Sequence, residues 1–207
     1  MRPLEIELES FRIIEREAGP HEFTPEQWPI VRRMIHTSAD FDYLRTVRFH
    51  PRAVSAGIEA LRAGRPVITD TNMARAGIRK QDAARLAVAV TCRMDDPAVH
   101  AAARRSGTTR AEAAVDAAVA EMGGGIYVVG NAPTALLRLI DRVVSGQARP
   151  ALIVGLPVGF VNAAESKAAL AALDHPFITN EGRKGGSNVA AAVVNALLLL
   201  AQEKATA

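Results

Sequence analysis

From residue 64 onward the chain repeats one pattern, in which a short aliphatic run is followed by a polar or glycine-containing turn and then an alanine-rich helix. The aliphatic runs are continuous rather than alternating, which is typical of strands buried on both faces of a parallel sheet. This repetition restricts the chain to an α/β fold. We predict strands at 66–70, 86–91, 125–130, 150–156 and 176–180.

Helices fit between and after these strands, and we predict them at 109–122, 132–146, 164–173 and 185–203. Two or three further helices precede residue 64, and the segment 51–64 opens with Pro51 and closes on Gly64, as a helix does. The expected fold is a three-layer α/β/α sandwich with a mainly parallel sheet. No linker, low-complexity segment or repeat divides the chain, so we expect a single domain over residues 1–207.

Bulk properties exclude several classes of function. Aromatic residues make up only 4% of the chain, and no basic run is interleaved with them, so a nucleic-acid partner is not expected. The longest apolar run is interrupted by Asn195 and falls short of the ~20 residues of a membrane span. The N-terminus lacks an apolar signal-peptide core, so we expect a soluble, cytoplasmic protein.

A helix expected after Thr24 and Pro25 carries a histidine beside two arginines where it ends. Its buried face is predicted to consist of Trp28, Val31, Met34 and Ile35. His36 lies off that face and shares a neighbouring stripe with Arg32 and Arg33. Two interpretations stay open at this point: a helix-end histidine that satisfies the last carbonyls, or a functional group placed among cations.

Four loops are expected at the carboxyl ends of the strands, where ligands of open α/β sheets bind. Their small residues let backbone amides approach a ligand, and Asn, Ser, Thr, Arg or Lys accompany them. Together they predict a rim suited to an anion. The loops are 69–80, 129–136, 155–167 and 179–188.

Familiar catalytic and nucleotide motifs are absent, including the nucleophile elbow, the Walker lysine loop and the dinucleotide-binding glycine turn. Cys92 is the only cysteine, and the histidines have no metal-ligand spacing, so we expect no metal and no other cofactor. The remaining residues fit a reaction that needs one titratable side chain and an anionic substrate held in a fixed position.

Two motifs name a family when they are taken together. "GNAPTAL" at 130–136 and "GLPVGFVNAAESK" at 155–167 are highly specific in combination. With the other matching segments they resemble the precorrin-8X methylmutase family of cobalamin biosynthesis over nearly the whole chain. The matching segments are 9–18, 31–51, 67–78, 106–114, 128–136, 152–170 and 182–197.

The resemblance implies a flavodoxin-like fold and a homodimer whose substrate pockets are completed across the subunit interface. It also implies an isomerase that moves a methyl group from C-11 to C-12 of ring C, turning precorrin-8X into hydrogenobyrinic acid. Such a migration needs a proton donor and a fixed substrate conformation. The family's catalytic histidine falls on His36. Its substrate-binding residues fall on, or are inferred at, Ser10, Arg33, Thr109, Arg110, Asn131, Arg183, Lys184 and Ser187.

A physical role for the two arginines follows as a hypothesis. Arg32 and Arg33 disfavour a second positive charge on His36 in the free protein, and a bound polycarboxylate would neutralise them, so binding would charge the acid. Three alternatives stay open. The first concerns the substrate, which we expect to be metal-free, with a cobalt-containing substrate as the alternative. The other two concern the function: the protein could be a carrier of an anionic tetrapyrrole or a nucleotide-binding regulator.

Overall fold

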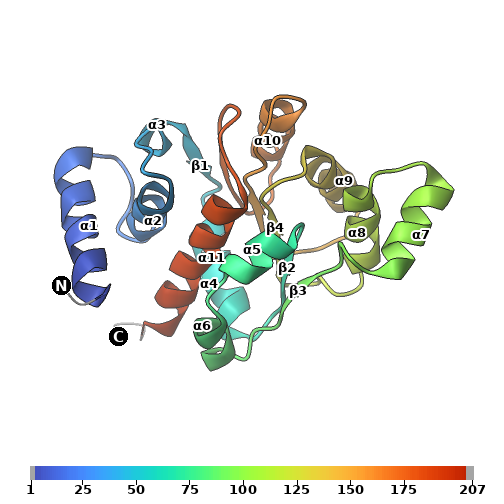
Figure 1. The fold of residues 1–207 in the computed structure, drawn as a ribbon, viewed down its shortest axis with the longest axis horizontal. Helices are drawn as coiled ribbons and strands as arrows, with labels where there is room; N and C mark the ends of the chain where they lie inside the picture. The colour runs from blue at the N-terminus through green and yellow to red at the C-terminus, as the bar shows by residue number, and fades with distance from the viewer. Residues whose placement is uncertain (1–2, 204–207) are drawn as a thin grey trace.

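A six-stranded sheet forms the centre of the computed structural model, which describes residues 3–203 (Figure 1). The strand order is β1-β6-β5-β4-β2-β3. All neighbouring strands are parallel except β1 and β6, where Val47 pairs with Asn180 in an antiparallel ladder. The parallel strands follow the order of a flavodoxin-like sheet. The strands are β1 Val47–Phe49, β2 Val67–Thr69, β3 Val90–Cys92, β4 Ile126–Val129, β5 Leu152–Gly155 and β6 Phe177–Asn180.

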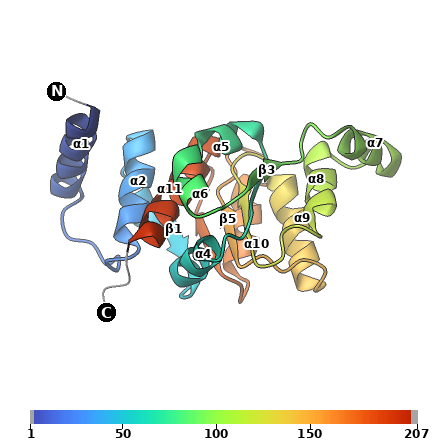
Figure 2. The same cartoon turned by 90° about the horizontal axis from the view of Figure 1, so that it is seen from below.

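Helices cover both faces of this sheet, and the outermost helices α1 and α7 stand at opposite ends of the molecule in both views (Figures 1 and 2). The helices before β3 are α1 Pro3–Ala18, α2 Trp28–Ser38, α3 Tyr43–Thr46, α4 Ala53–Arg62, α5 Asn72–Gly77 and α6 Lys80–Arg85. Those after β3 are α7 Pro97–Ser106, α8 Arg110–Ala118, α9 Pro133–Val144, α10 Ala163–Ala171 and α11 Ser187–Gln202.

Two hydrophobic cores lie on the two faces because successive strand residues point in opposite directions. Val128 and Val154 belong to the core shared with α2, α4 and α11, whereas their neighbours Val129 and Ile153 belong to the core shared with α8, α9 and α10. The three-layer sandwich expected from the sequence is therefore confirmed. Helix α11 contacts α2, α4 and α5 as well as the sheet, which explains why its apolar residues occur on all sides.

The structure corrects several predicted elements. Strand β3 begins at Val90 rather than at residue 86, because Leu86 ends α6 and Ala87 turns the chain at a φ of 54°. Strand β1 and helix α7 were not expected, and four helices rather than two or three precede residue 64 in the described chain. Helix α5 occupies half of the loop predicted at 69–80, and α6 begins at the last residue of that loop. Helix α2 begins at Trp28, since residues 25–27 form a preceding turn closed by the Thr24 carbonyl.

In the described part of the chain, no helix is long and apolar enough to cross a membrane.

Candidate active site

His36 lines a cavity of about 190 Å³ between α2 and α11. Its ring lies edge-on to that of Phe11 from α1, with the ring centroids 5.1 Å apart. None of the hydrogen bonds among residues 3–203 involves the His36 ring, so the interpretation as a cap on the helix carbonyls is not supported. The residues lining the cavity are Arg33, His36, Thr37, Gly77, Asn188, Ala191, Ala192 and Asn195.

Both arginines of the His36 stripe are paired with acids of α1. An Nη1 atom of Arg33 lies 3.1 Å from Glu7, and the corresponding atom of Arg32 lies 2.6 Å from Glu15. Hydrogen bonds from Trp28 and from Arg32 hold the pKa of Glu15 below its usual range, against the opposing effect of burial. The positive charge beside His36 is thus partly compensated before any ligand binds, which weakens the repulsion inferred from sequence. Only Arg33 of the two lines the cavity.

Asp70 follows β2 and organises the carboxyl end of the sheet. Its two carboxylate oxygens accept hydrogen bonds from the backbone N–H groups of Gly130, Asn131 and Ala132, at 2.9, 2.8 and 2.9 Å. Burial raises the pKa of this carboxyl, although the three N–H donors oppose the shift. The Asp70 carboxyl thus fixes the turn between β4 and α9, up to the residue that precedes the helix.

Ser187, the first residue of α11, packs against the turn between β4 and α9. Its Oγ lies 2.8 Å from Oγ1 of Thr71, the side chain that caps α5. Gly130 packs so closely on Ser187 that an added Cβ would lie 2.7 Å from the Ser187 Cα, so only glycine fits there. Asn131 is exposed on the adjoining turn, and Ser187 precedes Asn188 of the His36 cavity.

Thr109 and Arg110 lie at the start of α8, further from His36 along the rim. The Thr109 hydroxyl caps α8 in a capping box with Glu112 and also lies 3.2 Å from the hydroxyl of Thr134 on α9. Arg110 is exposed and lines a separate hollow of about 410 Å³ together with His100 and Arg104. The structure thus places this pair beside the α9 turn rather than in the His36 cavity.

Lys184 and Arg183 lie on the loop between β6 and α11. The Lys184 amine lies 2.6 Å from a carboxylate oxygen of Asp40 and 2.6 Å from one of Asp42, just beyond the end of α2. Hydrogen bonds to these two acids raise the pKa of Lys184 to about 12. Arg183 instead lies over the exposed ring of Phe160, 5.4 Å from its centroid. Neither cation lines the His36 cavity.

The side chain of Ser10 is bonded within its own helix. Its hydroxyl donates to the Ile6 carbonyl, 2.9 Å away within α1. Its neighbour Phe11 is the residue that touches His36. Of the predicted substrate-binding residues, therefore, Arg33 alone lines the cavity together with His36.

Sequence reasoning missed Asn188 and Asn195, which line the His36 cavity from α11. Asn195 fixes the turn between α5 and α6: its Oδ1 accepts from the Arg79 N–H at 2.8 Å, and its Nδ2 donates to the Gly77 carbonyl at 2.9 Å. The signal for it was present, because Asn195 is the polar residue that interrupts the longest apolar run.

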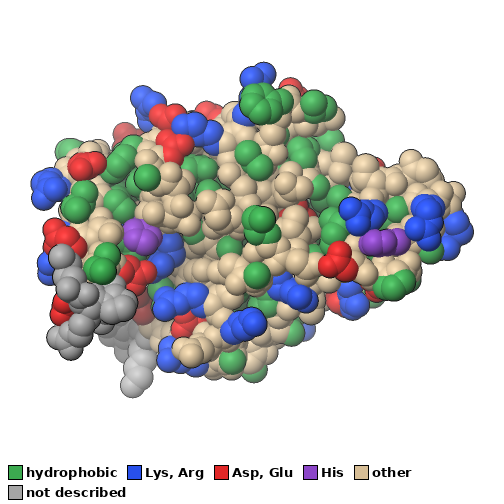
Figure 3. All heavy atoms as spheres, viewed as in Figure 1, with side chains coloured by type: hydrophobic (Ala, Val, Ile, Leu, Met, Phe, Trp, Pro, Cys, Tyr) green, Lys and Arg blue, Asp and Glu red, His purple; other side chains and the backbone are tan. Residues whose placement is uncertain are grey.

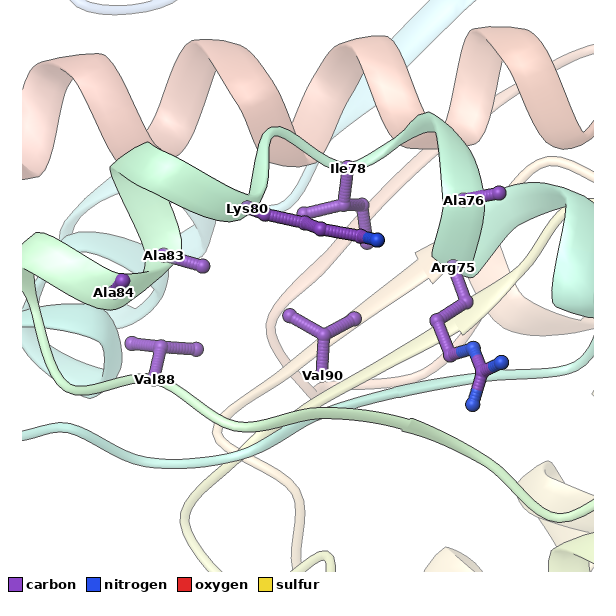
Figure 4. A pocket seen from close by; sticks show the side chains of 8 residues that line it. All are labelled: Arg75, Ala76, Ile78, Lys80, Ala83, Ala84, Val88 and Val90. Carbon is purple, nitrogen blue, oxygen red and sulfur yellow. The ribbon is translucent and has the colours of Figure 1, made fainter.

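A second cavity of about 380 Å³ lies on the other side of this turn, between α5, α6 and the edge strand β3 (Figure 4). On the face drawn in Figure 3, lysine and arginine side chains gather over the α5–α6 region and again over α7.

No group of three or more His, Cys, Asp or Glu side chains that could hold a metal ion occurs among the described residues.

The geometry describes a flavodoxin-like α/β protein with a histidine-containing cavity, and known proteins share both sequence and fold with it. A family model described as precorrin-8X methylmutase matches residues 5–200. The chain is 49% identical to the cobalt-precorrin-8 methylmutase of Priestia megaterium, over 100% of this chain and 92% of that protein. It is 40% identical to the precorrin-8X methylmutase of a Sinorhizobium species, over 91% and 90% of the two chains.

The solved structure of the precorrin-8x methyl mutase from Thermus thermophilus has a TM-score of 0.89 with this chain at 47% identity, covering 95% of each. The chain belongs to the precorrin-8X methylmutase family. It is an intramolecular isomerase, a precorrin-8 methylmutase of cobalamin biosynthesis.

Proposed function

We propose that the enzyme moves the methyl group of precorrin-8X from C-11 to C-12, giving hydrogenobyrinic acid, and that His36 is the proton donor. The bond from C-11 to the methyl carbon breaks and the bond from C-12 forms, so the reaction gains and loses no atoms. A proton placed on the macrocycle makes the migration terminus more electron-poor and is released again afterwards. One observation carries the proposal: His36 lines a cavity, and its ring has no hydrogen-bond partner among the described residues.

Arg33 is proposed to hold a substrate carboxylate beside the histidine. A guanidinium has five N–H donors, so the single contact with Glu7 leaves donors available for a ligand in the cavity. The Arg33 side chain is only 14% exposed, where a charge-assisted bond is screened less than at the surface. Binding energy placed here orients the macrocycle toward His36.

A second subunit is proposed to complete the site. The cavity of about 190 Å³ around His36 is smaller than the roughly 300–1,000 Å³ of ligand clefts, so a tetrapyrrole extends beyond it. The predicted homodimer, with each pocket closed by the partner, would supply the remaining wall. Analytical ultracentrifugation tests this: a protein that is monomeric with hydrogenobyrinic acid bound would contradict the shared pocket.

The same migration on cobalt-precorrin-8 is the second candidate function. Sequence identity supports it: the chain is 49% identical to the cobalt-precorrin-8 methylmutase of Priestia megaterium but 40% identical to the precorrin-8X methylmutase of Sinorhizobium. Parallel turnover of the two substrates decides between them. The natural substrate is the one with the larger kcat/KM, and turnover of neither would contradict the proposed function.

Two non-enzymatic readings make different predictions. A tetrapyrrole carrier has no need of a histidine in the cavity, and the sequence has no phosphate-loop or dinucleotide-binding motif of a nucleotide-binding regulator. Absorbance titrations with ATP, NAD and hydrogenobyrinic acid separate the readings. Binding of the tetrapyrrole alone is expected, and turnover of substrate then distinguishes the enzyme from a carrier.

A further inference from the structure

The cavity between α5, α6 and β3 has an apolar floor. Ile78 and Val88 on this floor are 2% and 7% exposed, and Val90 of the edge strand is half-buried. In Figure 4 the Lys80 side chain extends along the upper side of the hollow, and Arg75 borders its right-hand end. The hollow therefore combines an aliphatic surface with two cationic groups.

Some of the cations on α5 and α6 have an anionic partner among the described residues and others have none. Buried Asp82 pairs with Arg79 at 3.2 Å and with Arg85 at 3.1 Å, so both of these cations share one anionic partner. Within residues 3–203, neither Arg75 nor Lys80 has an ion pair or a side-chain hydrogen bond. The two cations without an anionic partner are thus the two that line the cavity.

The turn between α5 and α6 lies between this cavity and the His36 cavity. Asn195 holds it through the Gly77 carbonyl and the Arg79 N–H. Gly77 lies so close to α11 that an added Cβ would be 2.9 Å from Cβ of Ala191. Gly77 lines the His36 cavity, whereas its neighbours Ala76 and Ile78 line the second one. The turn at Gly77 therefore borders both cavities.

We propose that the second cavity binds an aliphatic carboxylate, namely one acidic side arm of the tetrapyrrole whose macrocycle lies at His36. The proposal rests on the function proposed above and deepens it. Methylene groups of the arm cover the Ile78 and Val90 surface, and the carboxylate lies between the Arg75 guanidinium and the Lys80 amine. Both partners are exposed, so each contact is moderate, but the two act on the same group.

The test compares two double variants that remove the same charge. Arg75→Gln/Lys80→Gln empties the proposed subsite, and Arg16→Gln/Arg149→Gln removes two exposed arginines that have no part in either cavity. Titration with hydrogenobyrinic acid should show Kd raised about tenfold in the first double variant and less than about twofold in the second. The first should also show a weaker dependence of Kd on salt, and Lys80→Arg should keep nearly wild-type affinity.

Equal Kd values for the first double variant and the wild type would overturn the subsite. Equal weakening in both double variants would overturn it as well, because the effect would then come from net charge. Wild-type protein that neither binds nor isomerises the tetrapyrrole would contradict the proposed function instead, so the two failures are distinguishable.

Discussion

At the scale of single residues, Phe11 connects the groups proposed for chemistry. Its ring packs edge-on against His36, and the guanidinium carbons of Arg32 and Arg33 lie 4.4 and 5.2 Å from its centroid. Such cation–π contacts fix planar guanidinium groups without using their hydrogen-bond donors. The aromatic ring therefore contacts the histidine and both arginines without occupying a hydrogen-bond donor of Arg33, the arginine that lines the cavity.

Lys167 is a second residue whose position is unusual. Its side chain is buried without a carboxylate partner, and its amine donates to the Asn180 Oδ1 at 3.2 Å and to the Lys184 carbonyl at 2.5 Å. Burial lowers the pKa of Lys167 to about 8. The lysine thus fastens the loop before α11 at the cost of burying a positive charge.

This burial predicts a characteristic pH dependence of stability. Because the pKa of Lys167 is lower in the folded protein than in the unfolded chain, the unfolded chain binds more protons between pH 8 and pH 10.5. The free energy of unfolding should therefore rise with pH across this window, by up to about 1.4 kcal/mol per pH unit relative to Lys167→Met. Urea unfolding of both proteins measures the difference. A difference that does not change with pH would contradict the buried charge.

At the scale of elements, the turn from β4 into α9 depends on Asp70. Asp70 supplies acceptors for three successive backbone N–H groups of this turn, the last of them on Ala132, the N-cap residue of α9. The same turn carries Asn131 and packs against Ser187, so the buried carboxyl group of Asp70 fixes the position of both residues.

Asp70→Asn should destabilise the protein by about 1–3 kcal/mol, because an amide nitrogen then faces a buried N–H donor that loses its acceptor. The urea midpoint measures the loss. Asp141→Asn is the matched control: its side chain is 66% exposed, and we expect a change within about 0.5 kcal/mol. Equal midpoints for the two variants would show that Asp70 does not hold the turn.

The elements that sequence predicted well are those with a strong local signal. The continuous aliphatic runs at β4, β5 and β6 identified the buried strands, since few other segments bury both faces. Strand β1 has only Val47, Arg48 and Phe49, too short for periodicity, and it is a strand because β6 pairs with it. Helices α5 and α6 have six residues each and depend on the distant Asn195 for their joining turn.

The site was predictable to the extent that a motif marks it. His36 and Arg33 were found three positions apart on one helix, and the structure places both in one cavity. The pairing of Arg33 with Glu7, and of Lys184 with Asp40, joins elements far apart in sequence. No local pattern specifies these contacts, so the charge balance of the site could only come from the fold.

At the scale of the whole molecule, the cavity is assembled from α2, α5 and α11, with α1 behind the histidine. The described residues contain no cluster that could hold a metal ion, and the proposed chemistry needs only a proton donor and orientation.

Turnover is therefore expected to be independent of added metal. Dialysis of the purified enzyme against EDTA should leave kcat with the metal-free substrate unchanged. Measuring the rate before and after dialysis, and again after adding back Zn²⁺ or Mg²⁺, tests this. A loss that metal restores would contradict the account.

The most direct test of the central claim is a pair of measurements on His36→Ala, with His21→Ala as a control histidine variant outside the cavity. Loss of a positioned proton donor should lower the single-turnover rate of methyl migration by about 10²- to 10⁴-fold, whereas His21→Ala should keep it. The affinity for hydrogenobyrinic acid should change far less, because the cations supply most of it. If folded His36→Ala binds the product normally and still turns over within about threefold of wild type, a barrier difference of only ~0.65 kcal/mol, then His36 is not the acid.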